Sequence, residues 1–201
     1  MNNKLEFDKE FSVVMACYNC EKYLDETIES LLKQSFSFKD HIQLILVDDG
    51  SEDMTAEICQ KYVHEYPENI LYLYQENQRQ GAARNNGLQY ATGKYVNFLD
   101  SDDKFREDTF ENVFNFFEKN YDEIDMVSVP VDFFDRQHGP HPLNYKYDNT
   151  KVINLNLTYD CPQLFVNSAF FKRELFDEIN FVTDLVNSED ALLINKILIK
   201  K

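Results

Sequence analysis

The chain has 201 residues, 43% of them hydrophobic, so it can bury one substantial core but is short for two full domains. Its formal net charge of −16 argues against broad contact with nucleic acid or anionic lipid, because both need clustered Lys and Arg. No stretch reaches the roughly 20 apolar residues that cross a bilayer, and the N-terminus has no apolar signal core, so we expect a cytoplasmic protein.

The first half of the chain alternates apolar runs with segments of helical periodicity. In chain order we predict strand Phe11–Ala16, helix Glu21–Phe36, strand Ile42–Val47, helix Thr55–Tyr66, strand Ile70–Tyr74, helix Ala82–Tyr90, strand Tyr95–Leu99 and helix Glu107–Lys119. The Phe-rich stretch Phe105–Phe117 is interpreted as a buried helix face. This alternation predicts an α/β fold whose parallel sheet is flanked by helices, with residues 1–104 as a nucleotide-binding half.

The pattern changes after Ile124. We predict a strand over Met126–Phe134, although it contains Pro130, and loops over Gln137–Asn149. A half-buried strand over Val152–Leu157 and a helix over Ser188–Lys200 follow. Residues 105–201 therefore form a mixed, partly antiparallel half of one domain spanning 1–201. The last helix has no stop signal at Lys201, so we expect a fragment of a longer protein, truncated at its C-terminus.

An acidic cluster, Asp100-Ser101-Asp102-Asp103, directly follows one predicted strand. Asp100 and Asp102 face the same side if the extended geometry continues. Paired carboxylates suit Mg²⁺ or Mn²⁺, which proteins commonly hold with one or two carboxylates plus substrate phosphates. The alternative is an Asp-rich turn that caps the helix beginning near Glu107.

Another predicted strand ends in Asp48-Asp49-Gly50-Ser51. A carboxylate here can accept hydrogen bonds from a ribose hydroxyl or a base N–H, whereas the alternative is a strand-to-loop turn with Gly50 at positive φ. In parallel sheets ligands bind at the carboxyl ends of the strands, so Tyr18-Asn19, Asp48-Asp49 and Asp100 to Asp103 should share one rim.

A helix with small residues at its start runs through Gly81-Ala82-Ala83-Arg84 and places Arg79 and Arg84 near the same rim. Arg84 can clamp a diphosphate. The alternative is that Arg84 pairs with one of the many carboxylates of this acidic chain.

Five segments resemble, in order and spacing, the family 2 glycosyltransferases of the GT-A fold, and the acidic-pair segment Asn187 to Ala191 resembles that of bacterial capsule and wall-polymer transferases. The five segments are Val13 to Asn19, Val47 to Ser51, Gly81 to Gly87, Ala91 to Tyr95 and Phe98 to Asp103. The chain departs from the family in having Ala16 where Pro is common and in lacking Trp.

The resemblance implies a GT-A (nucleotide-diphospho-sugar transferase) fold and a role for each matching residue. With the rim residues, the candidate nucleotide-binding set is Ala16, Tyr18, Asn19, Asp48, Asp49, Asn77, Arg79, Arg84, Asp100 and Ser101. Asp102, with Asp100, would hold the divalent cation, Mn²⁺ or Mg²⁺. Asp190 would be the general base and Glu189 the second candidate, in a segment whose alternative role is helix capping from Ser188.

The implied function is that of an inverting, metal-dependent hexosyl- or acetylhexosaminyl-transferase in synthesis of a cell-surface polysaccharide or wall polymer. The expected partners are a UDP-sugar donor and a glycan, polyol-phosphate or lipid-linked acceptor, and not nucleic acid. The expected place is the cytoplasm, including the inner face of the cell membrane, reached only through further segments or partners. The alternative is a non-catalytic nucleotide-sugar-binding or scaffold module of a larger protein, against which Asp100, Asp102 and Asp190 argue. A nucleotidyltransferase would need a Gly-rich basic loop after the first strand, which Cys17–Lys22 is not.

Overall fold

The structure, a computed structural model, describes residues 9–134, 138–142, 144, 150, 152–154, 165–183 and 189–199. Its strands are β1 (Phe11–Cys17), β2 (Ile42–Asp48), β3 (Ile70–Tyr74), β4 (Tyr95–Asp100), β5 (Met126–Ser128), β6 (Asp132–Phe133), β7 (Gly139–Pro140) and β8 (Ala169–Lys172). Its helices are α1 (Leu24–Leu32), α2 (Phe38–His41), α3 (Thr55–Glu65), α4 (Arg79–Leu88), α5 (Thr109–Asn120), the 3-10 helix η2 (Arg173–Asp177) and α6 (Glu189–Ile199).

The central sheet has the strand order β3-β2-β1-β4-β8-β5. The first four strands in that order are parallel, and β8 runs antiparallel to both β4 and β5. Cys17 pairs with Asp48 and Ala16 pairs with Asp100, so the carboxyl ends of β1, β2 and β4 lie together. The predicted α/β fold, mostly parallel with a partly antiparallel C-terminal part, is confirmed.

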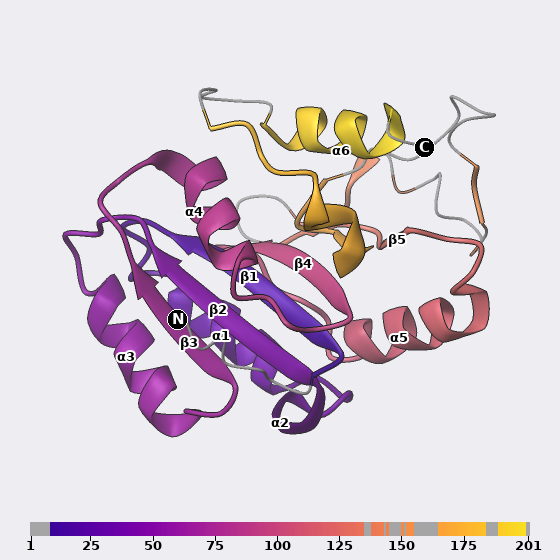
Figure 1. The fold of residues 1–201 in the computed structure, drawn as a ribbon. Helices are drawn as coiled ribbons and strands as arrows, with labels where there is room; N and C mark the ends of the chain where they lie inside the picture. Colours follow the sequence, from indigo (N-terminus) through magenta and orange to yellow (C-terminus); the bar gives the residue numbers. More distant parts are fainter. Residues whose placement is uncertain are drawn as a thin grey trace.

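Helices cover both faces of the sheet (Figure 1), and alternate strand residues feed two separate cores. Val13 and Met15 of β1 point into the core shared with α1, α3 and α5, whereas Val14 points into the core shared with α4 and α6. The predicted aromatic face of α5 is confirmed, because Phe110 and Phe117 are fully buried there. The sheet is therefore held rigidly from both sides, and its strand ends are free to carry polar groups.

Several predicted boundaries differ from the structure. The first predicted helix is shorter, at Leu24–Leu32, and the one predicted from Ala82 begins at Arg79. The predicted strand over Met126–Phe134 is broken at Pro130 into β5 and β6, because Pro cannot donate to a sheet ladder. Residues 152–154 are not in a strand, and 155–157 and Ser188 lie outside the described residues.

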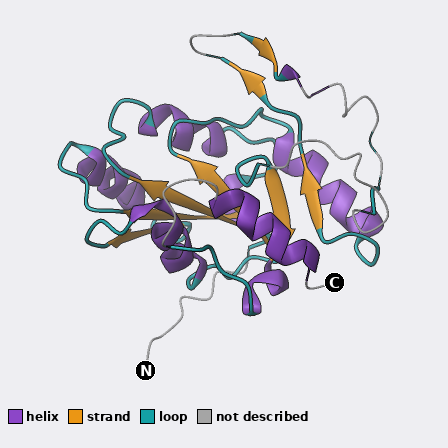
Figure 2. Cartoon of the chain, turned by 90° about the horizontal axis from the view of Figure 1, so that it is seen from above, coloured by secondary structure: helices purple, strands orange, loops and turns teal. Residues whose placement is uncertain are grey.

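The strands β6 and β7 form a small hairpin that projects from the rest of the molecule (Figure 2). Its first strand, β6, falls at the end of the predicted strand Met126–Phe134, and its second, β7, falls within the predicted loop-rich segment Gln137–Asn149. Among the described residues, no helix combines the length and the apolar character needed to cross a membrane.

Candidate active site

The end of β2 is built from two buried aspartates. Asp48 is fully buried, and its carboxylate accepts hydrogen bonds from the Ser51 backbone N–H at 2.8 Å and the Tyr72 hydroxyl at 2.8 Å. Asp49 accepts hydrogen bonds through one carboxylate oxygen from the Gln75 side chain at 2.7 Å and the Gln78 backbone N–H at 2.8 Å. Asp48 therefore shapes the turn from within, and Asp49 ties β2 to the start of α4. The nucleotide contacts expected of both residues stay a prediction.

The loop after β1 is joined to this turn. Asn19, in the left-handed conformation at φ 47°, donates its backbone N–H to the Ser51 hydroxyl at 3.0 Å, and its side-chain oxygen accepts from the Glu52 N–H at 2.8 Å. Asn tolerates this conformation better than most residues. Tyr18 beside it is 53% exposed. Tyr18 thus presents an exposed aromatic ring from a loop that the hydrogen bonds of Asn19 hold in place.

The predicted residues Asn77 and Arg79 come to the same rim. A side chain at Gly50, where φ is 77°, would lie 3.0 Å from the Asn77 backbone nitrogen, so the two turns are in close contact. Arg79 is exposed and also left-handed, at φ 74°, a conformation that costs roughly 1 to 2 kcal/mol for a residue with a Cβ. Such strain is most often tolerated where a residue has a function.

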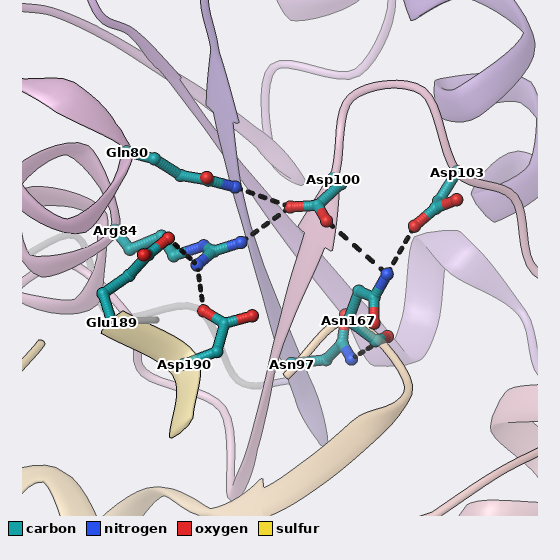
Figure 3. A network of polar contacts seen from close by, with 8 residues as sticks. All are labelled: Gln80, Arg84, Asn97, Asp100, Asp103, Asn167, Glu189 and Asp190. Atoms are coloured by element: carbon teal, nitrogen blue, oxygen red, sulfur yellow. Dashed lines mark hydrogen bonds and ion pairs between the residues drawn. The ribbon is translucent and has the colours of Figure 1, made fainter. Parts of the chain in front are cut away.

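Arg84 lies at the centre of a buried ion-pair network (Figure 3). Its side chain is 2% exposed, and its guanidinium contacts Asp100 at 2.7 Å and Asp190 at 2.6 Å. A third carboxylate, Glu189, lies 3.6 Å from the same guanidinium. Arg84 therefore pairs with carboxylates, as the alternative interpretation expected. These carboxylates are themselves predicted site residues, and Asp190 is 106 positions away from Arg84 in the sequence.

The acidic loop leaves the end of β4 with its three aspartates in different environments. Asp100 accepts hydrogen bonds from Arg84 at 2.7 Å and the Gln80 amide at 2.8 Å, whereas Asp102 is exposed. The backbone oxygen of Ser101 accepts from the Thr27 hydroxyl at 2.9 Å, which anchors the loop to α1. Burial raises the pKa of Asp103 to about 6, with the charge of Asp100 adding to the effect and the hydrogen bond from Asn167 opposing it.

Asp190 lies in the first turn of α6 and contacts the same network. Burial raises its pKa above the ordinary value, the charge of Arg84 opposes this, and Glu189 and Asp100 raise it further. Burial outweighs the lowering influences. A raised pKa suits a general base, because proton transfer is most efficient when the pKa lies near the working pH.

The acidic loop offers suitable atoms for a divalent cation. No three His, Cys, Asp or Glu side chains within the described ranges are grouped so as to hold a metal ion alone. Mg²⁺ and Mn²⁺ usually take one or two carboxylates and complete their coordination with substrate phosphates and water. Exposed Asp102 beside half-buried Asp100 matches that kind of donor set.

Four residues of the network in Figure 3 were not predicted as site residues: Gln80, Asn97, Asp103 and Asn167. Asn97 lies inside the predicted strand Tyr95–Leu99. Gln80 and Asp103 adjoin predicted segments, so their spacing offered a signal. Asn167 lies in the loop before β8, which no motif marks, and the β8 strand itself was not predicted because Ala169–Lys172 is only 4 residues long. Only the antiparallel pairing with β4 brings Asn167 to Asp100 and Asp103.

Comparison with known proteins identifies the chain's relatives. The family described as "Glycosyl transferase family 2" matches residues 12–180. The chain is 42% identical to the minor teichoic acid biosynthesis protein GgaB of Bacillus subtilis over 205 residues, covering 99% of this chain and 22% of that protein. It is 36% identical to GgaA of the same organism, covering 95% of this chain and 44% of that protein. The chain thus spans less than half the length of these relatives.

A solved structure of S. aureus TarS 1–349 in complex with UDP-GlcNAc has the same fold. It superposes with a TM-score of 0.78 at 26% identity, covering 94% of this chain and 53% of that chain. The α/β sheet with its antiparallel strand beside β4 is therefore an arrangement shared with a protein that binds a nucleotide sugar.

Proposed function

The chain belongs to glycosyl transferase family 2, and we propose that its site transfers a sugar from a UDP-sugar to a hydroxyl acceptor with inversion at the anomeric carbon. The observation that carries the proposal is the Arg84 network, which joins the acidic end of β4 to the first turn of α6. The acidic end of β4 is suited to a cation that binds the donor's diphosphate, and the first turn of α6 is suited to activating the acceptor.

Asp190 is the proposed general base. It accepts the proton of the acceptor hydroxyl as the hydroxyl oxygen attacks the anomeric carbon and the bond to the nucleoside diphosphate breaks. Its raised pKa and its place at the start of α6 support this role. Glu189, the neighbouring carboxylate on Arg84, is the second candidate. A single displacement of this kind needs no covalent enzyme intermediate.

Asp102 and Asp100 are the proposed ligands of a divalent cation, Mn²⁺ or Mg²⁺. When bound, such an ion supplies Lewis-acid stabilisation of the charge on the departing diphosphate. Asp102 is the accessible member, and Asp100 is held in place by Arg84 and Gln80.

The nucleotide is proposed to lie across the ends of β1 and β2. Tyr18 offers an exposed ring to the base, Asp49 has a carboxylate oxygen beyond the one that accepts from Gln75 and Gln78, and Arg79 adds a cation at the rim. The remaining nucleotide contacts are proposed to come from the end of β1 and the neighbouring loops, through Ala16, Asn19, Asn77 and Ser101.

The sugar is proposed to be a hexose or an N-acetylhexosamine, and the acceptor a glycan, polyol phosphate or lipid-linked precursor of a bacterial wall polymer. The names of the relatives support this acceptor class. We propose that the reaction takes place in the cytoplasm, including the inner face of the cell membrane.

The test is calorimetric titration of UDP into the chain with Mn²⁺ and, separately, with EDTA. We expect binding with Mn²⁺ that weakens by at least about tenfold both in EDTA and in Asp102→Ala, because the diphosphate loses its bridging cation. The matched control is Asp122→Ala, which removes an exposed carboxylate at the other end of α5 and should leave the affinity unchanged.

Asp190→Asn separates catalysis from binding. It should bind UDP with Mn²⁺ as the parent chain does and lose at least about 100-fold in transfer rate, as expected for removal of a general base. UDP binding without any turnover by the parent chain would favour the alternative of a non-catalytic module. Absence of UDP binding under both conditions would contradict the proposed donor site.

A further inference from the structure

A buried asparagine inside the sheet fixes the backbone beside the acidic loop. Asn97, in β4, is fully buried, and its amide donates to the backbone oxygens of Asn167 and Ala169, each at 2.9 Å. These two carbonyls belong to the entry of β8, which pairs with β4. Asn97 therefore sets where the Asn167 backbone stands relative to the end of β4.

The Asn167 side chain then reaches the acidic loop. Its amide nitrogen donates to Asp103 at 2.5 Å and lies 3.5 Å from the nearer oxygen of Asp100 (Figure 3). Asp100 is thus held from one side by Arg84 and Gln80 and approached from the other by Asn167. Among these three donors, only Asn167 also holds Asp103.

The two asparagines carry a cost to the stability of the fold. The side-chain oxygens of both Asn97 and Asn167 are buried without a hydrogen-bond partner within the described part of the chain. Each such acceptor costs about 1 to 3 kcal/mol. An apolar side chain would avoid that cost, so the two amides are explained better by their N–H groups: those of Asn97 hold the backbone of Asn167, and those of Asn167 bond to the acidic loop.

We propose that Asn167 is a positioning residue for the cation-binding loop. Its amide separates the like-charged carboxylates of Asp100 and Asp103 and keeps Asp103 turned toward β8, which leaves Asp102 as the exposed carboxylate. The backbone bond from the Asp103 N–H to the Asp100 oxygen, at 3.1 Å, closes the same turn. The proposal rests on the function proposed above, because it concerns the order of that donor site.

The test uses Asn167→Ala and Asn167→Leu, the second of which keeps the side-chain volume and removes the donor. UDP is titrated into each variant with Mn²⁺ and with EDTA. We expect the dissociation constant with Mn²⁺ to rise about tenfold, as for other residues that orient metal ligands, and the value in EDTA to stay unchanged. A role confined to packing would leave Asn167→Leu like the parent chain or weaken both values in parallel.

One further variant tests the role of Asn97, and another serves as a control. Asn97→Ala frees the backbone that carries Asn167 and should reproduce part of the Mn²⁺-dependent loss. Asn112→Leu removes another amide-to-carboxylate bond, to Asp108 at 3.0 Å on the exposed face of α5, and should change neither value. UDP binding by the parent chain with equal affinity in both Asn167 variants would overturn this inference alone. Failure of the parent chain to bind UDP would overturn the proposed function and this inference with it.

Discussion

Among the residues that the structure describes, Arg84 is the one cation that three buried or half-buried carboxylates share. Replacing it in Arg84→Met keeps a side chain of similar length but leaves Asp100, Glu189 and Asp190 without their partner. Removing one partner of a buried ion pair leaves the other partner as an uncompensated buried charge. We therefore expect the free energy of unfolding to fall by about 3 kcal/mol. Urea denaturation at about pH 8 measures it.

The loss should depend on pH in a defined direction. Burial already raises the pKa of Asp190 against the opposing charge of Arg84, so removing Arg84 raises it further. A carboxyl group whose folded pKa exceeds its unfolded pKa lowers stability above that pKa, and the penalty disappears as the pH falls through it. The destabilisation should therefore shrink between about pH 8 and about pH 5. Arg79→Met, on the exposed rim of the same helix, should cost little at either pH, and an equal loss for Arg84→Met at both would contradict the ion-pair account.

The limits of sequence reasoning at the residue scale lie in this network. The apolar run of β4 ends at Asp100, so the sequence marks that carboxylate as a rim residue. Arg84 and Asp190 are 106 positions apart, and nothing local indicates that they touch. Asn167 carries no motif, because its role depends on backbone placed by Asn97 rather than on its neighbours in sequence.

At the scale of elements, the strands buried on both faces were predictable because their apolar runs are long and end abruptly. The parallel strands β1 to β4 match their predicted ranges to within a residue or so. By contrast, β5 and β8 are short, and their strand state depends on pairing with each other and with β4. Helix ends were predicted less well, since tertiary contacts rather than periodicity decide the last turn.

The close fit of α4 on the sheet gives a prediction at this scale. A Cβ at Gly87 would stand 2.5 Å from Val14 and 2.9 Å from Val47. Gly87→Ala gains about 1 kcal/mol of helix propensity, but overpacking of a core costs about 1 to 3 kcal/mol. We therefore expect net destabilisation in urea, together with weaker UDP binding, because α4 carries Arg84.

Gly81→Ala is the matched control in the same helix. Its Cβ would meet the Val182 backbone oxygen at 3.0 Å, a milder approach than either valine makes at Gly87. It gains a similar helix propensity, so it should be nearly neutral or slightly destabilising. If Gly87→Ala were at least as stable as the parent chain, close packing of α4 on β1 and β2 would not require glycine at this position.

For the whole molecule, repulsion among the excess negative charges should affect stability more than any individual surface ion pair does. The formal charge is −16, and surface pairs such as Lys33–Glu29 and Lys61–Asp25 are exposed, so each contributes little. Salt screens the general repulsion among the carboxylates as the Debye length falls below about 10 Å. We expect the melting temperature to rise by about 3 °C between roughly 0.05 M and roughly 0.5 M NaCl.

Magnesium chloride at matched ionic strength separates this general screening from binding at the acidic loop. If Mg²⁺ occupies the site formed by Asp100 and Asp102, it should raise the melting temperature beyond the NaCl value, because a ligand that binds only the folded state stabilises it. Asp102→Ala should lose that excess and keep the response to NaCl. It removes one of many surface charges, which matters little to screening, and it also removes a proposed cation ligand. Identical curves for the two salts in the parent chain would mean that the loop binds the free ion weakly. The cation would then enter the site with the diphosphate, an order consistent with a donor set that substrate phosphates complete.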